Sequence, residues 1–411
     1  MKERILIIED NRALSKILTK KMEKNLDYEV VQAYSYDEAE EIINENDDFF
    51  ITLCDLNLPD APDGEIVDFV ISKGLPVIVL TGSIDEDLRK EMLGKNIVDY
   101  VYKGNIEDVN YIFTLIQRLS KNRDIKVLAV DDSLVFRKEI KKLLQSQMFS
   151  VLIAAHGEEA LNYLENNQDI KLVLTDFNMP VIDGVELTKN IREKHDKDDM
   201  PIIGMTGSED HLVSAKFLKI GANDFINKPF SKEELICRIN NTLDAKEHLE
   251  MVTEMANKDF MTKAYNRRYF FQEVESFYKT NSNFAIAMID IDLFKKINDK
   301  YGHDLGDLVI ITLANTLKYH TKGSDLVARF GGEEFCIALR DVNRKQAIGF
   351  FAKLRKEISD ISINTINVKI KFSVSIGVAF SSDRKIDELL KEADEALYRA
   401  KENGRNRVEI A

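Results

Sequence analysis

The sequence predicts an α/β protein of about three domains, in which two doubly wound parallel sheets precede a mixed α/β domain. Two observations predict the sheets. Residues 1 to about 243 contain one unit written twice, and each copy alternates continuous apolar runs with helix-period patterns, as parallel strands covered by helices do. A third observation predicts the last domain: from residue 259 the repeat stops, and a period-two apolar pattern precedes an amphipathic helix.

The repeat is defined by four strand-like runs in each copy, and each run ends at a polar residue. The separation between the threonine that ends the third run and the lysine that ends the fourth is identical in both copies. Because the carboxyl ends of parallel strands share one edge of a sheet, these polar side chains should gather there. The matched runs are 5–10 with 127–132, 51–55 with 172–176, 77–81 with 202–206, and 100–103 with 225–228.

The gathered groups predict phosphoryl chemistry. Three carboxylates favour Mg²⁺, a threonine hydroxyl can donate a hydrogen bond to a phosphoryl oxygen, and a lysine can pair with its charge. The single acid that ends the central strand, Asp55 or Asp176, is then the expected carboxylate nucleophile.

This constellation resembles the receiver domains of bacterial two-component response regulators, which have flavodoxin-like folds. The resemblance implies one Mg²⁺ per receiver, and phosphorylation of Asp176 and Asp55 by a sensor histidine kinase or a phosphotransfer protein. The residues implied in Mg²⁺ and phosphoryl binding are Asp131, Asp132, Asp176, Thr206 and Lys228 in the second copy, and Glu9, Asp10, Asp55, Thr81 and Lys103 in the first.

The first copy departs from this family at two places beside the expected phosphoacceptor. Lys103 is followed by Gly104, where the second copy has the usual Lys228-Pro229. The loop after Asp55 is also one residue longer than its counterpart. Both departures bear on the phosphorylation rate more than on the fold. The alternative to phosphorylation is that the receivers serve only as dimerisation scaffolds, and this alternative is more favoured for the first copy than for the second.

The connections between the expected domains are short. Residues 111–119 read as a helix and the next strand begins near Ile125, so the two receivers should pack as a near-rigid pair. Residues 232–257 contain no glycine or proline and predict one continuous helix that transmits receiver geometry. Its heptad pattern is too short and irregular to predict a stable isolated coiled coil. The expected boundaries are 1–122, 123–243, 244–258 for the linker, and 259–411.

Residues 329–335, Arg-Phe-Gly-Gly-Glu-Glu-Phe, predict a tight hairpin. Two short apolar runs flank Gly331-Gly332, and both positions of a two-residue turn favour positive φ. Glu333 and Glu334 should then project on opposite sides of the returning strand. Adjacent acids beside a backbone that can approach a phosphate favour a hard cation.

The rest of the last third supplies a further acid. Residues 284–290 predict a buried strand that ends at Asp290, with Asp292 two residues later and a helix after it. Strict alternation from 368 to 379 predicts a long half-buried strand or strand pair. Residues 386–400 predict a closing helix with one apolar face and Gly404 as its C-cap.

Seven ordered motifs make residues 259–411 similar to the GGDEF family of diguanylate cyclases, which condense two GTP molecules to cyclic di-GMP and two pyrophosphates. The resemblance implies two Mg²⁺ ions per active site and an obligatory homodimer, because each catalytic domain holds one GTP. The motifs are Asp259 with Thr262 and Asn266-Arg267-Arg268; Asp290-Ile291-Asp292 with Phe294-Lys295; Asn298-Asp299 with Gly302-His303; Gly306-Asp307; Gly331 to Phe335; Ser375-Ile376-Gly377; and Tyr398, Lys401 and Arg405.

The chemistry of this family gives the motif residues roles. Carboxylates are implied in metal binding and catalysis, an amide and a carboxylate in guanine recognition, and loop N–H groups with two cations in binding the β- and γ-phosphates. The implied residues are Asp290, Glu333 and the Ile291 carbonyl for metal, Glu334 as an assisting carboxylate, Asn298 and Asp307 for guanine, and Leu293, Phe294, Lys295, Lys401 and Arg405 for phosphates.

Simpler interpretations remain open for single residues. Asp290 could only cap the following helix, Lys401 and Arg405 could be a solvated helix end, and His303 is expected to be structural. For the whole domain, the alternative is an effector that binds GTP or cyclic di-GMP without synthesis. A cyclase that also takes ATP is disfavoured by Asp307.

One departure concerns the family's product-inhibition site. Lys322-Gly323-Ser324-Asp325 has lysine where the family has arginine. Lysine lacks the bidentate, stackable guanidinium that grips a guanine and a phosphate. We therefore expect weak or absent feedback inhibition through this site.

The composition excludes several classes of protein. A net charge of −14 argues against a general nucleic-acid or membrane-surface binder. A transcription factor is not expected either, because no basic helix-turn-helix pattern follows the receivers. Apolar residues make up 44% of the chain, as in globular domains, and no run approaches the roughly 20 apolar residues of a membrane span. The N-terminus shows no signal region, so a cytoplasmic location is expected. Three scattered cysteines are expected to be reduced core thiols.

Overall fold

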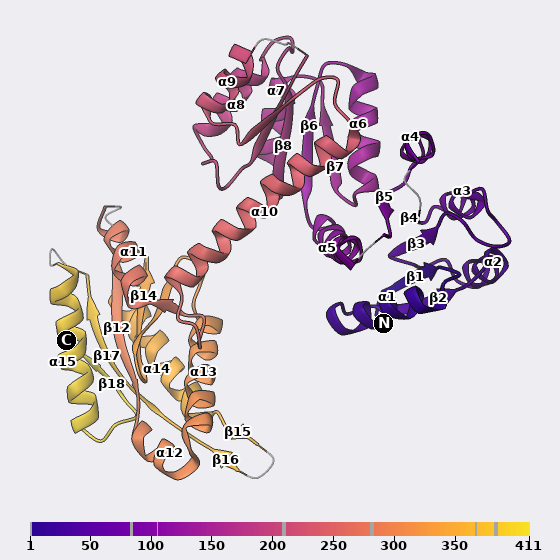
Figure 1. Cartoon of the computed structure of the whole chain (residues 1–411). Helices are drawn as coiled ribbons and strands as arrows, with labels where there is room; N and C mark the ends of the chain where they lie inside the picture. The colour runs from indigo at the N-terminus through magenta and orange to yellow at the C-terminus, as the bar shows by residue number, and fades with distance from the viewer. Residues whose placement is uncertain are drawn as a thin grey trace. The chain divides into compact units, whose positions relative to one another are not determined.

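The computed structural model describes residues 2–82, 85–104, 106–207, 211–279, 283–365, 368–381 and 385–411. The chain divides into two compact units, Met1–Glu247 and His248–Ala411. The first unit holds both copies of the repeat and the second holds the last domain (Figure 1). The predicted α/β class, with two parallel sheets before a mixed sheet, is confirmed.

The first copy is a five-stranded parallel sheet in the order β2-β1-β3-β4-β5. Helices α1 and α5 cover one face, and α2, α3 and α4 cover the other. Coverage on both faces explains why its central strands are continuously apolar. The elements are β1 (Arg4–Ile8), α1 (Arg12–Asn25), β2 (Glu29–Ala33), α2 (Tyr36–Glu45), β3 (Ile51–Asp55), α3 (Glu65–Ser72), β4 (Val77–Thr81), α4 (Glu86–Gly94), β5 (Asp99–Tyr102) and α5 (Ile106–Asn122).

The second copy repeats this topology in the order β7-β6-β8-β9-β10. Helices α6 and α10 pack on one face of its sheet, and α7 and α8 pack on the other. The elements are β6 (Lys126–Val130), α6 (Leu134–Ser146), β7 (Ser150–Ala154), α7 (Gly157–Asn166), β8 (Ile170–Asp176), α8 (Gly184–Arg192), β9 (Ile202–Thr206), α9 (His211–Ile220), β10 (Asp224–Asn227) and α10 (Lys232–Asn257).

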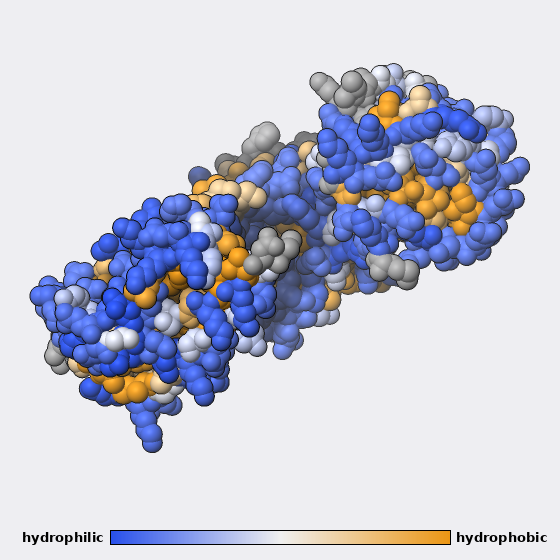
Figure 2. Space-filling view, turned by 90° about the horizontal axis from the view of Figure 1, so that it is seen from below, coloured by the Kyte–Doolittle hydropathy of each residue, from blue (hydrophilic) through white to orange (hydrophobic). Residues whose placement is uncertain are grey.

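Helix α10 is a single helix of 26 residues, as predicted. Leu235, Ile239 and Leu243 on its first half are buried in the core of the second copy. On its second half Leu249 and Val252 are 42% and 61% exposed. Figure 2 shows a mainly hydrophilic surface with scattered apolar areas.

The last domain is built on a six-stranded mixed sheet in the order β11-β13-β14-β12-β17-β18, with a separate pair β15-β16. Central strand β12 is antiparallel to both of its neighbours. The elements are β11 (Tyr265–Asn266), α11 (Arg267–Lys279), β12 (Phe284–Ile291), α12 (Phe294–Tyr301), α13 (His303–His320), β13 (Leu326–Gly331), β14 (Glu334–Arg340), α14 (Arg344–Asp360), β15 (Ile363–Asn364), β16 (Lys369–Ile370), β17 (Val374–Phe380), α15 (Ile386–Glu402) and β18 (Val408–Ile410).

Strand β17 corrects one expectation. The alternating pattern forms two separate strands, β16, which pairs with β15, and β17, which lies in the six-stranded sheet and is buried on both faces rather than on one. Helices α13 and α14 cover one face of the sheet, and α11 and α15 cover the other (Figure 1). Residue 377 is a glycine because α15 lies against it: a Cβ on Gly377 would come within 2.1 Å of the backbone of α15.

The cysteines also differ from expectation. Cys54 and Cys336 are buried, and burial raises the pKa of both thiols, but Cys237 on α10 is exposed. The prediction of a core thiol is therefore wrong for Cys237. Among the described helices, none is long and apolar enough to cross a membrane.

Candidate functional site

The acidic hairpin of the last domain turns one residue later than predicted. Gly331 pairs with Glu334, so the two-residue loop consists of Gly332 and Glu333. Both glycines have positive φ, 155° and 50°, and a register shift between Arg329 and Gly331 accommodates them. Glu333 therefore lies on the turn, and the expectation that it projects from the returning strand is wrong. Glu334 does lie on that strand.

Arg329 holds the tip of this hairpin, a role that the sequence reasoning did not assign. Its Nε and Nη2 donate to the Gly332 carbonyl at 2.9 and 2.7 Å, and its Nη1 donates to Asp259 Oδ1 at 3.0 Å. The hydroxyl of Thr262 also donates to Asp259 Oδ1. Burial raises the pKa of Asp259, but the bonds from Thr262 and Arg329 outweigh it, so the pKa is lowered. The carboxylate is therefore a stable anchor for Arg329.

Asp290 stands opposite the hairpin in the neighbouring strand. It pairs in register with Glu334, it is 6% exposed, and its Oδ2 lies 2.8 Å from Lys401 Nζ. Burial is the main cause that raises the pKa of Asp290; Lys401 opposes it, while the charges of Glu333 and Glu334 add to it. Asp290, Glu333 and Glu334 thus lie close enough for their charges to interact, and such a group of carboxylates suits cations.

Two simpler interpretations are now resolved. Asp290 does not cap α12, because the N-cap is Leu293, which makes no side-chain capping bond. Lys401 is not merely part of a solvated helix end, because it pairs with Asp290. Arg405 lies exposed beyond α15 with φ of 61°.

The loop before α12 exposes backbone donors. Leu293 has left-handed φ and ψ of 54° and 33°, and the first N–H groups of a helix have no partner within it. The N–H groups of Phe294 and Lys295 are therefore suited to an anion. Asp292 anchors this loop: its carboxylate accepts from Ser373 and Ser375, each at 2.6 Å, and from the Asn406 N–H.

Asn298 and Asp307 lie on adjacent helices, α12 and α13. The Oδ1 of Asn298 is buried without a hydrogen-bond partner among the described residues. It lies against Gly306, where a Cβ would come within 1.8 Å of it. Asp307 is exposed. A buried acceptor beside an exposed carboxylate fits a ligand edge with several N–H donors, and guanine has such an edge.

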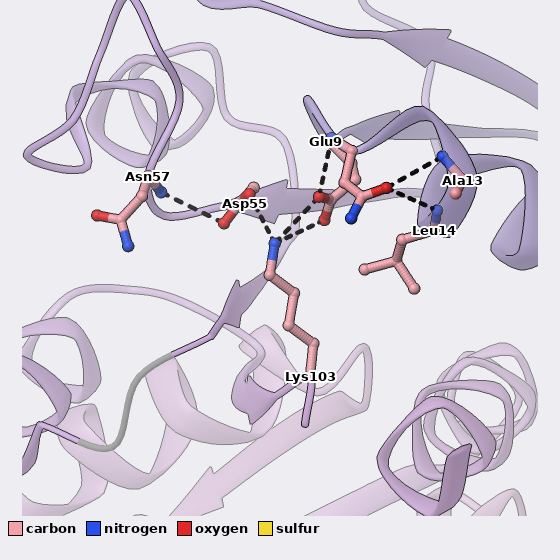
Figure 3. A network of polar contacts seen from close by, with 7 residues as sticks. Glu9, Ala13, Leu14, Asp55, Asn57 and Lys103 are labelled. Atoms are coloured by element: carbon pink, nitrogen blue, oxygen red, sulfur yellow. Dashed lines mark hydrogen bonds and ion pairs between the residues drawn. The ribbon is translucent and has the colours of Figure 1, made fainter. Parts of the chain in front are cut away.

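The first copy gathers its predicted residues at the carboxyl edge of its sheet. Lys103 Nζ points between two carboxylates, at 2.6 Å from Asp55 Oδ2 and 2.8 Å from Glu9 Oε2 (Figure 3). Glu9, Asp10 and Asp55 can bring one oxygen each within 4.8 Å of one another, which fits a cation. Burial chiefly raises the pKa of Glu9, with Lys103 opposing and Asp55 adding to the shift. Thr81 is buried at the end of β4.

The second copy has a similar centre. Lys228 Nζ lies 2.6 Å from both Asp131 Oδ2 and Asp176 Oδ1, and Thr206 is buried at the end of β9. Burial raises the pKa of Asp176 more than Lys228 lowers it. Asp132 is exposed, and among the residues with assigned positions the three acids here do not form as close a group as in the first copy. Its oxygen donors still suit Mg²⁺.

Two families match the chain. The family described as "Response regulator receiver domain" matches residues 5–111 and 127–240, which together exceed half of the chain. The family described as "Diguanylate cyclase, GGDEF domain" matches residues 256–407.

Curated relatives and a solved structure are similar to parts of this chain. Response regulator PleD of Caulobacter vibrioides is 31% identical over 254 residues, 58% of this chain and 56% of that protein. Diguanylate cyclase DgcM of Escherichia coli is 38% identical over 42% of this chain and 43% of its own. The chain thus spans only about half the length of these curated relatives.

A crystal structure described as a two-component system response regulator/GGDEF domain protein is 39% identical, with a TM-score of 0.55. The match covers 60% of this chain and all of that one. With two receiver domains, here receiver 1 and receiver 2, followed by a GGDEF domain, the chain belongs to the response regulator family.

Proposed function

We propose that this protein is a diguanylate cyclase controlled by its receivers. Two GTP molecules, one on each chain of a homodimer, condense to cyclic di-GMP and two pyrophosphates. The observation that carries the proposal is the register of β12 and β14, which sets buried Asp290 opposite Glu334 and beside the hairpin acid Glu333. A binding module without synthesis would not need these acids.

The residues divide the work by chemistry. Asp290, Glu333 and the Ile291 carbonyl would hold two Mg²⁺ ions, which acidify the attacking 3′-hydroxyl and offset charge on the leaving pyrophosphate. Each 3′-hydroxyl releases its proton to solvent, and its oxygen bonds the α-phosphorus of the other GTP as the bond to pyrophosphate breaks. Glu334 assists, Asn298 and Asp307 bind the guanine edge, and the N–H groups of Leu293, Phe294 and Lys295 bind phosphates with Lys401 and Arg405.

Control comes from phosphorylation of Asp176 and Asp55 by a sensor histidine kinase or a phosphotransfer protein. The carboxylate oxygen bonds phosphorus as the phosphorus–nitrogen bond of the donor histidine breaks. Thr206 and Lys228, or Thr81 and Lys103, bind the transferred group, with one Mg²⁺ per receiver. Phosphorylation then shifts the population toward the dimer in which two GGDEF domains meet. GTP is a cytoplasmic substrate, so we assign the activity to the cytoplasm.

One incubation tests the proposal. Purified protein is mixed with GTP and Mg²⁺, with and without beryllofluoride, and the product is identified. Cyclic di-GMP, formed faster with beryllofluoride, is expected. Binding of GTP or cyclic di-GMP without product would favour the effector alternative. An unchanged rate and oligomeric state with beryllofluoride would contradict control by phosphorylation.

Arg329 should position the hairpin for catalysis. Arg329→Ala removes both bonds to the Gly332 carbonyl, so we expect kcat to fall about 10²-fold with a smaller change in KM for GTP, because small misplacements are costly. Arg329→Lys should restore only part of the rate. Arg267→Ala is the control, since Arg267 packs over Phe330 without holding the turn. Equal losses in both alanine variants would contradict this role.

Feedback inhibition should be weak. Both oxygens of Asp325 are engaged, accepting from the backbone N–H groups of Lys322 at 2.8 Å and Arg340 at 3.0 Å. With lysine at 322, the site also lacks a guanidinium to grip cyclic di-GMP. We expect turnover to be little changed by added cyclic di-GMP. Submicromolar inhibition that disappears in Asp325→Ala would contradict the prediction.

A further inference from the structure

Receiver 1 makes a charged contact with α10, the helix that leads to the GGDEF domain. Arg118 on α5 is only 6% exposed, and its Nη1 donates to Asp244 Oδ1 at 3.1 Å and to Glu247 Oε1 at 2.6 Å. Lys121, one turn later, lies 2.5 Å from the other oxygen of Glu247. We name the contact of Arg118 and Lys121 with Asp244 and Glu247 the α5–α10 clamp.

The clamp buries the charged side chain of Arg118 between partly exposed acids. Burying a guanidinium is unfavourable unless carboxylates compensate it. Burial raises the pKa of Glu247, yet Lys121 and Arg118 lower it by more, so this acid stays ionised within the clamp. The Nη2 of Arg118 remains buried without a partner among the described residues. An incompletely satisfied buried network suits an arrangement that has to change.

Hydrogen bonds link the clamp to β5, the strand that Lys103 directly follows. Arg118 Nε donates to Asn122 Oδ1 at 2.8 Å, and Asn122 Nδ2 donates to the Gln147 carbonyl at 2.9 Å. The Nε2 of Gln147, a buried residue of receiver 2, donates to the Val98 carbonyl at 2.7 Å. Val98 directly precedes β5, and Lys103 directly follows it.

A second bond connects β5 to α5. Tyr111 Oη on α5 donates to Asp99 Oδ2 on β5 at 2.6 Å. A pocket of about 430 Å³ lies beside these groups and is lined by residues of both α5 and α10. Because Lys103 binds Asp55, the predicted phosphoacceptor is connected to the clamp through β5 and these hydrogen bonds.

We propose that receiver 1 controls α10 through the α5–α10 clamp, with Arg118 as the residue that couples Asp55 to the helix. The inference rests on the proposed function, because it specifies how one receiver regulates the cyclase. Receiver 2 acts on α10 directly, since this helix is part of its own fold. The two receivers therefore act on one helix by separate routes, and only one route needs Arg118.

The test separates the two routes in the full chain. In an Asp176→Asn background only receiver 1 responds to beryllofluoride, and in Asp55→Asn only receiver 2 does. Arg118→Gln should reduce stimulation of the cyclase about fivefold or more in the first background, and leave it nearly unchanged in the second. The proposal would be overturned if Arg118→Gln reduced stimulation equally in both backgrounds or in neither. It would also be overturned if the Asp176→Asn chain with Arg118 intact did not respond to beryllofluoride.

Further variants distinguish loss of the clamp from misfolding, and a measurement without GTP keeps the test independent of the proposed cyclase activity. Glu247→Gln, at a half-exposed position, should cause the same selective loss, and the double variant should be no worse than either single one. Arg123→Gln is the matched control, because Arg123, which directly follows α5, pairs with Glu3 of receiver 1 and not with α10. Hydrogen exchange of α10 gives a readout without GTP: beryllofluoride should change exchange in the Asp176→Asn chain, and Arg118→Gln should abolish that change. A change that survives Arg118→Gln overturns the inference even if no cyclic di-GMP is made.

Discussion

Asp290→Asn should lower the rate of cyclic di-GMP formation by about 10³-fold, which corresponds to about 4 kcal/mol of transition-state stabilisation. The carboxylate is buried opposite Glu334, and an amide of the same shape removes one of the negative charges that would hold Mg²⁺. Folding should not suffer, because burial already disfavours the ionised form of Asp290. The measurements are kcat with saturating GTP and Mg²⁺, and thermal melting of the same preparation.

Asp292→Asn is the matched control for Asp290. It is a second buried acid on the same segment, but its oxygens accept from Ser373, Ser375 and the backbone of Asn406. An asparagine keeps one acceptor oxygen and loses the other, so the loop should loosen and the domain should melt earlier. If Asp290→Asn retained more than a tenth of the parent rate, or if both variants lost activity only through unfolding, the metal-binding role of Asp290 would be wrong.

The two parallel sheets could be predicted because the patterns that indicate them are short-range features of the sequence. A strand buried on both faces is continuously apolar, and the polar residue at its carboxyl end lies at the functional edge. The predicted closeness of lysine and aspartate is therefore confirmed in both receivers. The two atoms of each pair lie 2.6 Å apart, Lys103 with Asp55 and Lys228 with Asp176. What they do chemically stays a prediction.

The errors came from tertiary packing. Two consecutive glycines fit a turn at 331–332 or at 332–333, and the register shift after Arg329 selects the second. Alternation in β17 suggested an exposed face, but its small residues instead admit α15 against the backbone. Cys237 lies on the first half of α10, where the apolar residues have helical spacing. That spacing does not show whether Cys237 itself is buried or exposed.

The partners of Arg329 and Asn298 could not be found from the sequence. Arg329 and Asp259 are 70 residues apart, and no periodicity relates them. The resemblance implies guanine binding by Asn298, whereas the burial of its acceptor oxygen beside Gly306 is a feature of the folded domain. Such contacts depend on tertiary packing between distant segments, which short-range patterns do not specify.

Gly377→Ala should destabilise the GGDEF domain by about 3 kcal/mol, since overpacking a well-filled core has this cost. The added Cβ would lie 2.1 Å from both the Ala393 carbonyl and the Leu397 amide, and backbone cannot move aside as a flexible side chain can. Hydrogen exchange of peptides from β17 and α15 should become faster, because α15 has to move away from the sheet. This readout reports on the domain alone, which is needed because a chain of several domains is not expected to unfold in one two-state transition.

Gly349→Ala provides a control of opposite sign. Gly349 lies inside α14 with nothing within 4 Å of an added Cβ, and alanine is the better helix former by about 0.5–1 kcal/mol. The same chemical change should therefore slow exchange in α14 while Gly377→Ala accelerates it in α15. If the two variants were equally stable, the close approach of α15 to β17 would not be a feature of the folded protein. Loss of stability in Gly377→Ala alone would establish that contact as the reason for glycine at 377.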